Sequence, residues 1–266
     1  MQFYKYQGTG NDFIIVNDET FPLNDSKLIS KLCDRHFGIG SDGLISLSHV
    51  DENNFSVRIF NSDGFEANLC GNGLRCIGKF IKDQNFDGNK FNIRTKTQSV
   101  VIEYETGKIK ITFPSPKFIK ENLKINIDNQ EYLIHFVDVG ALHAVCFLED
   151  IQSIDVNALG KKIRFSKSFL PHGSNVDFVQ IDDSKIFVRT YERGVEQETL
   201  SCGTGAIASA FCSYLFHNLS DKIKVFFSGG EIFIHFELDH QNIKKVQMLG
   251  SAFFVFKTKV DVNSFL

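Results

Sequence analysis

Two cysteines stand in matching surroundings and are the residues best suited to chemistry. Cys70 opens the run Cys-Gly-Asn-Gly and Cys202 opens Cys-Gly-Thr-Gly, and an apolar-periodic segment follows each. That periodicity predicts a helix with one buried face after each cysteine. A cysteine at a helix N-terminus faces backbone N–H groups and the positive end of the helix dipole, which favour a thiolate. The sequence therefore predicts two reactive thiols.

Two matched thiols suit the inversion of a stereocentre, which needs a base on one face of the carbon and an acid on the other. A thiolate and a thiol supply both and exchange roles in the reverse reaction. The N–H groups of two helix ends suit a carboxylate that gains charge as its α-carbon loses a proton. No cofactor, no pyridoxal phosphate and no metal is then required. The other four cysteines lack flanking glycines and are predicted to be buried filler: Cys33, Cys76, Cys146 and Cys212.

The two predicted helices lie about half the chain length apart, which indicates a duplicated chain. The buried faces would carry Leu74, Ile77 and Ile81 in the first helix, and Ile207, Phe211, Tyr214 and Leu215 in the second. A further feature looks repeated. In each half a polar turn that contains an Asn runs into an apolar strand, at Gly10-Asn11-Asp12-Phe13-Ile14 and at Gly173-Ser174-Asn175-Val176.

Many strand-like runs surround each predicted helix, which favours an α/β (α+β) fold of two similar halves. Each half would be a curled mixed β-sheet around a central helix. Phe113-Pro114-Ser115-Pro116 is the best boundary. We therefore expect one domain at 1–114 with Cys70 and one at 115–266 with Cys202, and the last strand can return to the first half.

Three local predictions concern the remaining elements. A helix begins near Asn24, Asp25 or Ser26 and runs to about His36, with Leu28, Leu32 and Phe37 inside. A single long strand covers 246–260. Residues 38–43 match Gly-x-Gly-x-x-Gly, but a helix precedes them and a strand follows. They are therefore expected to form a loop rather than a dinucleotide site.

Composition limits the function classes. With 266 residues, 42% of them hydrophobic, the chain can bury two modest cores. Its net charge is −3 and no basic run stands out, so we expect no nucleic-acid partner. The chain has no leader-like start and no apolar run of spanning length, which predicts a cytoplasmic protein without a membrane partner. Its cysteines should then be reduced, and the lack of Cys-x-x-Cys disfavours zinc.

Several motifs together make the sequence resemble the diaminopimelate epimerases. These motifs are 5–13, 60–64 with 70–75, 192–194 and 198–205, and the resemblance extends over nearly the whole chain. It implies cofactor-independent conversion of LL- to meso-2,6-diaminopimelate, in lysine and peptidoglycan-precursor biosynthesis. It also implies two α/β halves related by a pseudo-twofold axis, an active site in the cleft between them, and a homodimer. Cys70 would donate and Cys202 would accept the proton for the LL substrate.

The resemblance also assigns roles to other residues. Amides of the two cysteine motifs would hold the reacting carboxylate: Gly71, Asn72, Gly203 and Thr204. The substrate's other polar groups would meet Asn11, Asn61, Asn175, Glu192 and Arg193. His143 and Glu192 would also tune the thiols. Simpler interpretations stay open: the three Asn can be turn residues, Arg193 a surface ion pair, and His143 a satisfied core histidine.

This sequence departs from the family pattern at three places. Ala141 stands where many members have a substrate-contacting Asn, and Gly43 stands where some have Gln. The segment 192–199 is one residue longer than in the family. Two other functions are therefore considered: an amino-acid racemase of the same fold acting on proline or hydroxyproline, and a non-catalytic protein that binds a small anion. Arg193 with three Asn favours a substrate that has a second charged end, which proline lacks.

Overall fold

The computed structural model describes residues 1–67, 69–240 and 242–265; Asn68, Gln241 and Leu266 lie outside it. Contacts divide the chain into one unit of residues 1–112 with 249–266 and a second unit of residues 113–248. The division at Phe113 lies beside the predicted boundary after Pro114, and the C-terminal segment belongs to the first unit. The predicted class, a mixed α/β fold with few helices, is confirmed.

The first unit pairs its strands in the order β18–β1–β2–β3–β4–β6–β7–β8, and β5 also pairs with β4. Two of the pairs are parallel: α1 connects β2 to β3, and α2 lies between β4 and β6. The elements are β1 (Gln2–Gly8), β2 (Asn11–Val16), α1 (Ser26–Cys33), β3 (Gly43–Asp51), β4 (Asn54–Asn61), β5 (Glu66–Ala67), α2 (Gly71–Asp83), β6 (Lys90–Arg94), β7 (Ser99–Glu105), β8 (Lys108–Pro114), β18 (Phe253–Lys259) and the 3-10 helix η2 (Val262–Phe265).

The second unit has the pairing order β9–β10–β11–β12–β13–β15–β16, and β14 pairs with β13. Its parallel pairs are again two: α3 lies between β11 and β12, and α4 between β13 and β15. The elements are β9 (Lys117–Ile127), β10 (Gln130–Asp138), β11 (Leu142–Phe147), α3 (Val156–Arg164), η1 (Lys167–Phe169), β12 (Asn175–Asp182), β13 (Lys185–Glu192), β14 (Gln197–Thr199), α4 (Gly203–His217), β15 (Lys222–Phe227), β16 (Gly230–Asp239) and β17 (Asn242–Gly250).

The two units therefore repeat one topology, in which β2, β3 and β4 correspond to β11, β12 and β13. This correspondence corrects one sequence interpretation. Asn11 begins β2 whereas Asn175 begins β12, so the two asparagines are not equivalent. The register makes Gly43 the counterpart of Asn175, and Phe13 the counterpart of His143. The two segments look alike in sequence because a polar turn commonly precedes a strand that enters a core.

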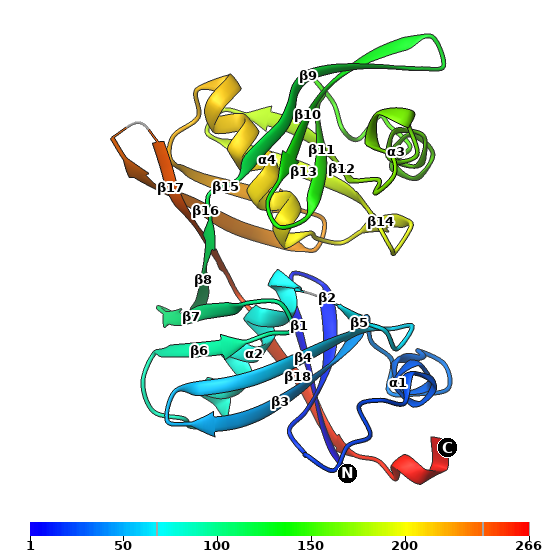
Figure 1. The fold of residues 1–266 in the computed structure, drawn as a ribbon, viewed down its shortest axis with the longest axis vertical. Helices are drawn as coiled ribbons and strands as arrows, with labels where there is room; N and C mark the ends of the chain where they lie inside the picture. Colours follow the sequence, from blue (N-terminus) through cyan, green and yellow to red (C-terminus); the bar gives the residue numbers. More distant parts are fainter. Residues whose placement is uncertain (68, 241, 266) are drawn as a thin grey trace. The chain divides into compact units, whose positions relative to one another are not determined.

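The central helices are α2 and α4 (Figure 1), and each is buried on more than the predicted single face. Leu74, Ile77 and Ile81 of α2 are fully buried, as predicted. In α4 every residue from Gly205 to Ser213 is buried, whereas the predicted core residue Leu215 is 44% exposed. The sequence periodicity of α4 is weak because a helix enclosed on all sides needs no polar face.

Three further predictions are wrong in detail. Helix α1 begins after the N-cap Asp25 but ends at Cys33, since Asp34 adopts an extended backbone. Phe37 consequently lies beyond the helix and is 87% exposed. The predicted strand over 246–260 is two strands that break at residues 251–252. Strand β9, whose side chains are mostly exposed, was not predicted.

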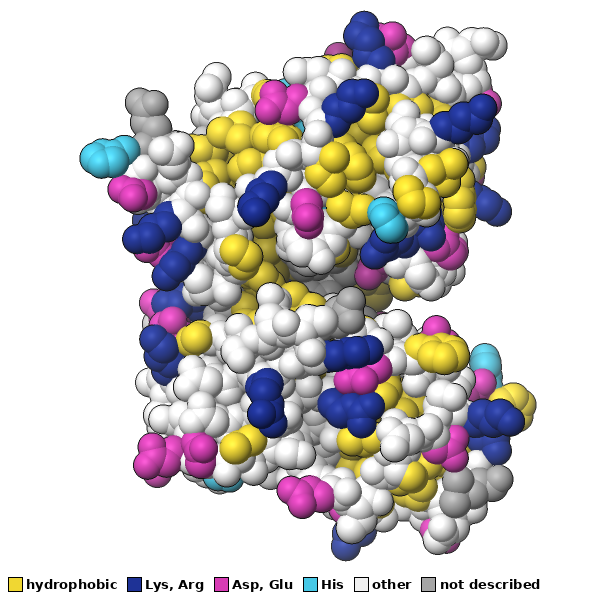
Figure 2. Space-filling model, viewed as in Figure 1, with side chains coloured by type: hydrophobic (Ala, Val, Ile, Leu, Met, Phe, Trp, Pro, Cys, Tyr) yellow, Lys and Arg dark blue, Asp and Glu magenta, His cyan; other side chains and the backbone are white. Residues whose placement is uncertain are grey.

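The surface mixes charges of both signs, and on the face shown in Figure 2 basic side chains alternate with acidic ones. Within the described ranges, no helix has the length and apolar character needed to cross a bilayer.

Candidate active site

Cys70 and Cys202 occupy the N-cap positions of α2 and α4 with nearly the same backbone geometry, which confirms the prediction that helices follow them. Their φ and ψ angles are −141° and 112° for Cys70, and −128° and 115° for Cys202. In each case Sγ accepts a hydrogen bond of 3.4 Å from the amide three residues on, that of Gly73 or Gly205. The thiols therefore sit at the positive ends of two helices, where a thiolate and a carboxylate are both stabilised. None of the six cysteines forms a disulfide.

The first half-site surrounds Cys70, which is half-buried. Its Sγ lies 3.8 Å from Asn11 Oδ1, which also accepts a 3.2 Å hydrogen bond from Asn72 Nδ2. Asn11 Nδ2 donates to Asp42 at 2.8 Å. This bond fixes the amide so that its oxygen faces the thiol, where it can accept the S–H proton. The structure thus brings together three predicted residues: Cys70, Asn11 and Asn72.

A buried cation supports the turn that carries Asn11. Arg75 on α2 is fully buried and donates to the Thr9 hydroxyl at 2.7 Å. Burial lowers the pKa of its guanidinium to about 10. Gly250 packs against it, because a Cβ there would lie 2.9 Å from Arg75 Nε. Thr9 has a φ of 52°, so the bond holds a strained turn in place.

Charged residues hold Asp42 in position beside Asn11. Arg35 bridges Asp12 and Asp42 at 2.8 and 2.7 Å, and Lys5 pairs with Asp12 at 2.7 Å. Burial alone would raise the pKa of the Asp12 carboxyl. The bonds from Arg35 and Lys5 outweigh it and lower the pKa to about 2.

The second half-site surrounds Cys202, which is 4% exposed. Its Sγ lies 3.5 Å from Thr204 Oγ1, and that hydroxyl lies 2.9 Å from His143 Nε2. The other ring nitrogen of His143 bonds Asp177 Oδ2 at 2.7 Å, and Thr190 donates to Asp177 Oδ1 at 2.7 Å. His143 is fully buried with both nitrogens bonded, as a core histidine would be. Its bonds nevertheless lead directly to the reactive thiol.

Burial is the largest cause that raises the pKa of the Cys202 thiol well above its ordinary value, and the charges of Glu192 and Asp177 raise it further. Glu192 ends β13, where its carboxylate accepts a 3.0 Å bond from Thr199. Glu192 therefore lies near enough to Cys202 for its charge to act on the thiol. Its negative charge opposes the thiolate.

Asn175 and Arg193 are joined to each other. Asn175 Oδ1 accepts the Arg193 backbone N–H at 2.9 Å, and Nδ2 donates to Leu142 O and His143 Nε2 at 3.0 and 3.3 Å. Asn175 thus uses its amide inside the protein to position His143. The exposed Arg193 side chain donates to the His172 carbonyl at 3.1 Å.

The remaining positions that the sequence singled out are Asn61, Gly43, Ala141 and the longer segment after Glu192. Asn61 ends β4 opposite Gly43 and is exposed. Gly43 leaves no room for a side chain on this backbone, since a Cβ would lie 2.4 Å from Phe60 O. Ala141 lies in the turn before β11. The longer segment after Glu192 is a turn whose Glu196 forms an ion pair with Arg164 at 2.6 Å.

Sequence reasoning missed Asp177 and Thr190. Asp177 follows Asn175 by two residues on β12, so both side chains point to the same face. Thr190 is the cross-strand partner of Asp177. Both residues are fully buried. The signal was an Asp flanked by the apolar residues Val176, Phe178 and Val179, a setting in which an unbonded carboxylate is rare.

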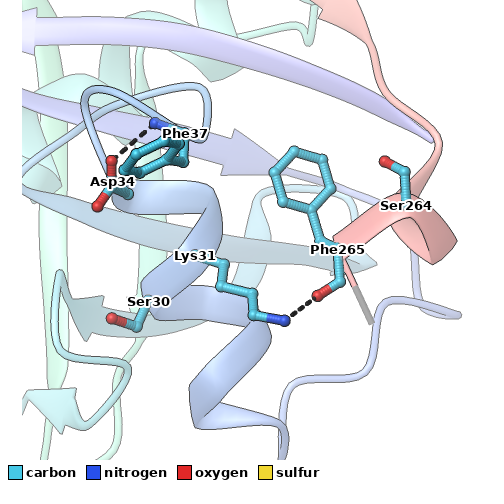
Figure 3. A pocket seen from close by; sticks show the side chains of 6 residues that line it. All are labelled: Ser30, Lys31, Asp34, Phe37, Ser264 and Phe265. Carbon is cyan, nitrogen blue, oxygen red and sulfur yellow. Dashed lines mark hydrogen bonds between the residues drawn. The ribbon is translucent and has the colours of Figure 1, made fainter.

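Other places in the described chain offer less. Figure 3 shows a surface hollow of about 640 Å³ lined by Ser30, Lys31, Asp34, Phe37, Ser264 and Phe265. Its Lys31 donates to the Phe265 carbonyl at 2.7 Å, and Asp34 accepts backbone amides of its own turn, so its charged groups hold the chain together. Among the described residues, no three His, Cys, Asp or Glu side chains are grouped to hold a metal ion.

Comparisons with known proteins give the family of the chain. The family model described as "Diaminopimelate epimerase" matches residues 3–115 and 135–255. A diaminopimelate epimerase of Aquifex aeolicus is 39% identical over 276 residues, with 98% of each chain covered.

Two solved structures share the fold. A PhzF-family phenazine biosynthesis protein of Bacillus anthracis has a TM-score of 0.76 at 14% identity, with 98% of each chain covered. A probable proline racemase of Agrobacterium radiobacter K84 has a TM-score of 0.71 at 12% identity, covering 98% of this chain and 92% of its own. On the family model and the sequence relative together, the chain belongs to the diaminopimelate epimerase family.

Proposed function

We propose that the protein interconverts LL- and meso-2,6-diaminopimelate without a cofactor, a step in lysine and peptidoglycan-precursor biosynthesis. The observation that carries this proposal is the repetition of one N-cap thiol geometry, at Cys70 and at Cys202, in a chain of this family. The two thiols would act on opposite faces of one α-carbon. The substrate is a small amino acid, and no other partner is needed for the chemistry.

In the LL direction Cys202 would remove the α-proton as a thiolate while Cys70 delivers a proton to the other face as a thiol. The bond from Asn11 suits this assignment, because its amide oxygen faces Sγ of Cys70 and accepts an S–H donor. A general acid or base at each face contributes roughly 10²–10⁴-fold to the rate. In the reverse direction each sulfur takes the other role.

The first turns of α2 and α4 would hold the reacting carboxylate. Gly71 and Gly203 occupy the first helical positions, followed by Asn72 and Thr204. Helix N-termini direct N–H groups outward and suit an anion. The charge that leaves the α-carbon spreads onto that carboxylate, so such donors favour the carbanion over the ground state.

A racemase acting on proline or hydroxyproline is the alternative, since a probable proline racemase shares the fold. Incubation in deuterated water distinguishes the two. LL-diaminopimelate should yield the meso isomer with deuterium at one α-carbon, and proline should not exchange. Exchange of proline with none of diaminopimelate would select the racemase, and exchange of neither would favour a binding protein.

We also propose that the protein is a cytoplasmic homodimer. Two reactive thiols need a reducing compartment to remain thiols. Residues Phe253–Phe256 of β18 are apolar and between 39% and 55% exposed, a surface that a second copy would cover. Light scattering should give the mass of two chains for the wild type and of one chain for Val255→Lys. A monomeric wild type would contradict the dimer.

A further inference from the structure

The two half-sites repeat their backbone but differ in the side chains beneath the thiols. The register places His143, Asp177 and Thr190 of the second unit at the positions that Phe13, Ile45 and Ile59 hold in the first. The glycine in the first turn of each helix confirms the match. A Cβ on Gly205 would meet Asp177 first, and one on Gly73 would meet Ile45 first. At these three positions the side chains are therefore polar in the unit of Cys202 and apolar in the unit of Cys70.

The hydrogen bonds fix the tautomer of His143. The backbone N–H of Arg193 can only donate, so the Asn175 atom that it contacts is the amide oxygen. The other end of Asn175 is then NH₂, which also suits its bond to the Leu142 carbonyl. That NH₂ donates to His143 Nε2, so Nε2 carries no proton. The ring proton is on Nδ1 and points at Asp177.

The same directions continue from Nε2 to the sulfur. The Thr204 hydroxyl, 2.9 Å away, donates to the same single lone pair of the unprotonated Nε2, as the shorter of two donors in a three-centre bond with the Asn175 amide at 3.3 Å. Its oxygen keeps lone pairs for the S–H of Cys202 at 3.5 Å. One continuous path results: Cys202 S–H to Thr204 O–H to His143 Nε2, with Nδ1–H held by Asp177.

Cys202 needs such a path. It is 4% exposed, so solvent has little access to its proton, and Glu192 and Asp177 place negative charge near the sulfur. The titratable groups that face it are His143 on β11, Asp177 on β12 and Glu192 on β13. A proton moved onto His143 puts a positive charge between Asp177 and the sulfur, which offsets both negative charges.

We propose that Thr204 relays the thiol proton of Cys202 to His143 and that Asp177 is the residue that positions His143 for it. In the first unit Phe13 and Ile45 hold the positions of His143 and Asp177, and neither side chain can accept a proton. The S–H bond of Cys202 breaks as its proton bonds to Thr204 Oγ1, and the hydroxyl proton moves to Nε2. A thiol and an imidazole become a thiolate and an imidazolium, and no oxidant or reductant takes part. The proposal rests on the epimerase function, since it explains how the base for the LL substrate forms.

The test combines nitrogen NMR of His143 with the pH profile of kcat/KM. In the wild type the NMR shifts should show a proton on Nδ1 and none on Nε2. Asp177→Asn should move it to Nε2, because an amide NH₂ cannot accept from Nδ1–H. A proton on Nε2 in the wild type would overturn the relay, whatever the enzyme does with diaminopimelate. A wild type inactive on diaminopimelate would instead overturn the proposed function, and the NMR result would still decide the tautomer.

For the pH profile, Thr204→Val removes the hydroxyl and keeps the side-chain size, and Thr204→Ser restores the hydroxyl. We expect Thr204→Val to lower kcat/KM near neutral pH by roughly 10²–10³-fold. The loss should shrink as the pH rises, because a larger fraction of Cys202 is then already a thiolate and needs no relay. Thr204→Ser should recover at least about tenfold of it. An equal loss in both variants, independent of pH, would mean a purely structural role and would overturn the relay.

Discussion

A methyl group added in the first turn of α4 should do far more damage than the same group added in the first turn of α2. Gly205 and Gly73 occupy equivalent positions, three residues after Cys202 and Cys70. A Cβ at 205 would lie 2.5 Å from Asp177 Oδ1 and 3.2 Å from Thr190 Oγ1. A Cβ at 73 would meet only the end of Ile45, at 3.1 Å, before atoms at ordinary contact distance.

The magnitudes follow from these contacts. Overpacking a core costs about 1–3 kcal/mol, and disturbing the bonds of a buried carboxylate costs roughly another 1–3 kcal/mol. Replacing a helical Gly by Ala returns about 0.4–1 kcal/mol. Gly205→Ala should therefore lower the free energy of unfolding by roughly 2–4 kcal/mol. Gly73→Ala should change it by less than about 1 kcal/mol, because the Ile45 side chain can rotate away.

Differential scanning calorimetry of both variants measures the difference. For a chain of this size, Gly205→Ala should melt roughly 5–12 °C below Gly73→Ala. The displaced Asp177 should also lower kcat of Gly205→Ala by at least about a hundredfold. Equal melting temperatures for the two variants would refute the claim that a buried carboxylate lies directly beneath Gly205.

Two further predictions concern acid stability and oxidation. Because the pKa of Asp12 is held near 2, below its unfolded value of about 4, its ionised form stabilises the fold above pH 4. That contribution is lost as the pH falls through about 2. Asp12→Asn should lower the free energy of unfolding by roughly 2–3 kcal/mol at neutral pH, as measured by urea titration, and its difference from the wild type should vanish towards pH 2. A difference that does not depend on pH would contradict the assignment. Air oxidation of the substrate-free enzyme should abolish activity by joining Cys70 to Cys202, and dithiothreitol should restore it. Full activity after air oxidation, measured without a reductant, would count against this.

Much of the architecture was accessible from the sequence because its signals are local. Glycines after a cysteine, followed by apolar residues at helical spacing, predicted α2 and α4 and placed both thiols at N-caps. The equivalence of strands across the halves was not accessible, because it depends on which strands pair. Asn11 and Asn175 have similar neighbours yet begin strands at different places in the sheet.

The polar chain beneath Cys202 was hidden for a related reason. His143, Asp177 and Thr190 lie on three strands, and only their register brings them into hydrogen-bond contact. Thr190 alone looks like any strand threonine. Phe37 was assigned to a helix because its spacing fits, but Asp34 adopts an extended backbone and its carboxylate accepts the amides of His36 and Phe37 in a local turn, which ends α1.

The isotope exchange of single-cysteine variants tests the account most directly. In deuterated water Cys70→Ala keeps Cys202, so it should exchange the α-hydrogen of LL-diaminopimelate and return it as the LL isomer. Cys202→Ala keeps Cys70 and should exchange only the D-configured centre of the meso isomer. Neither variant should convert one isomer into the other, because each lacks the partner on the opposite face. Conversion at the wild-type rate by either variant would contradict the two-thiol mechanism.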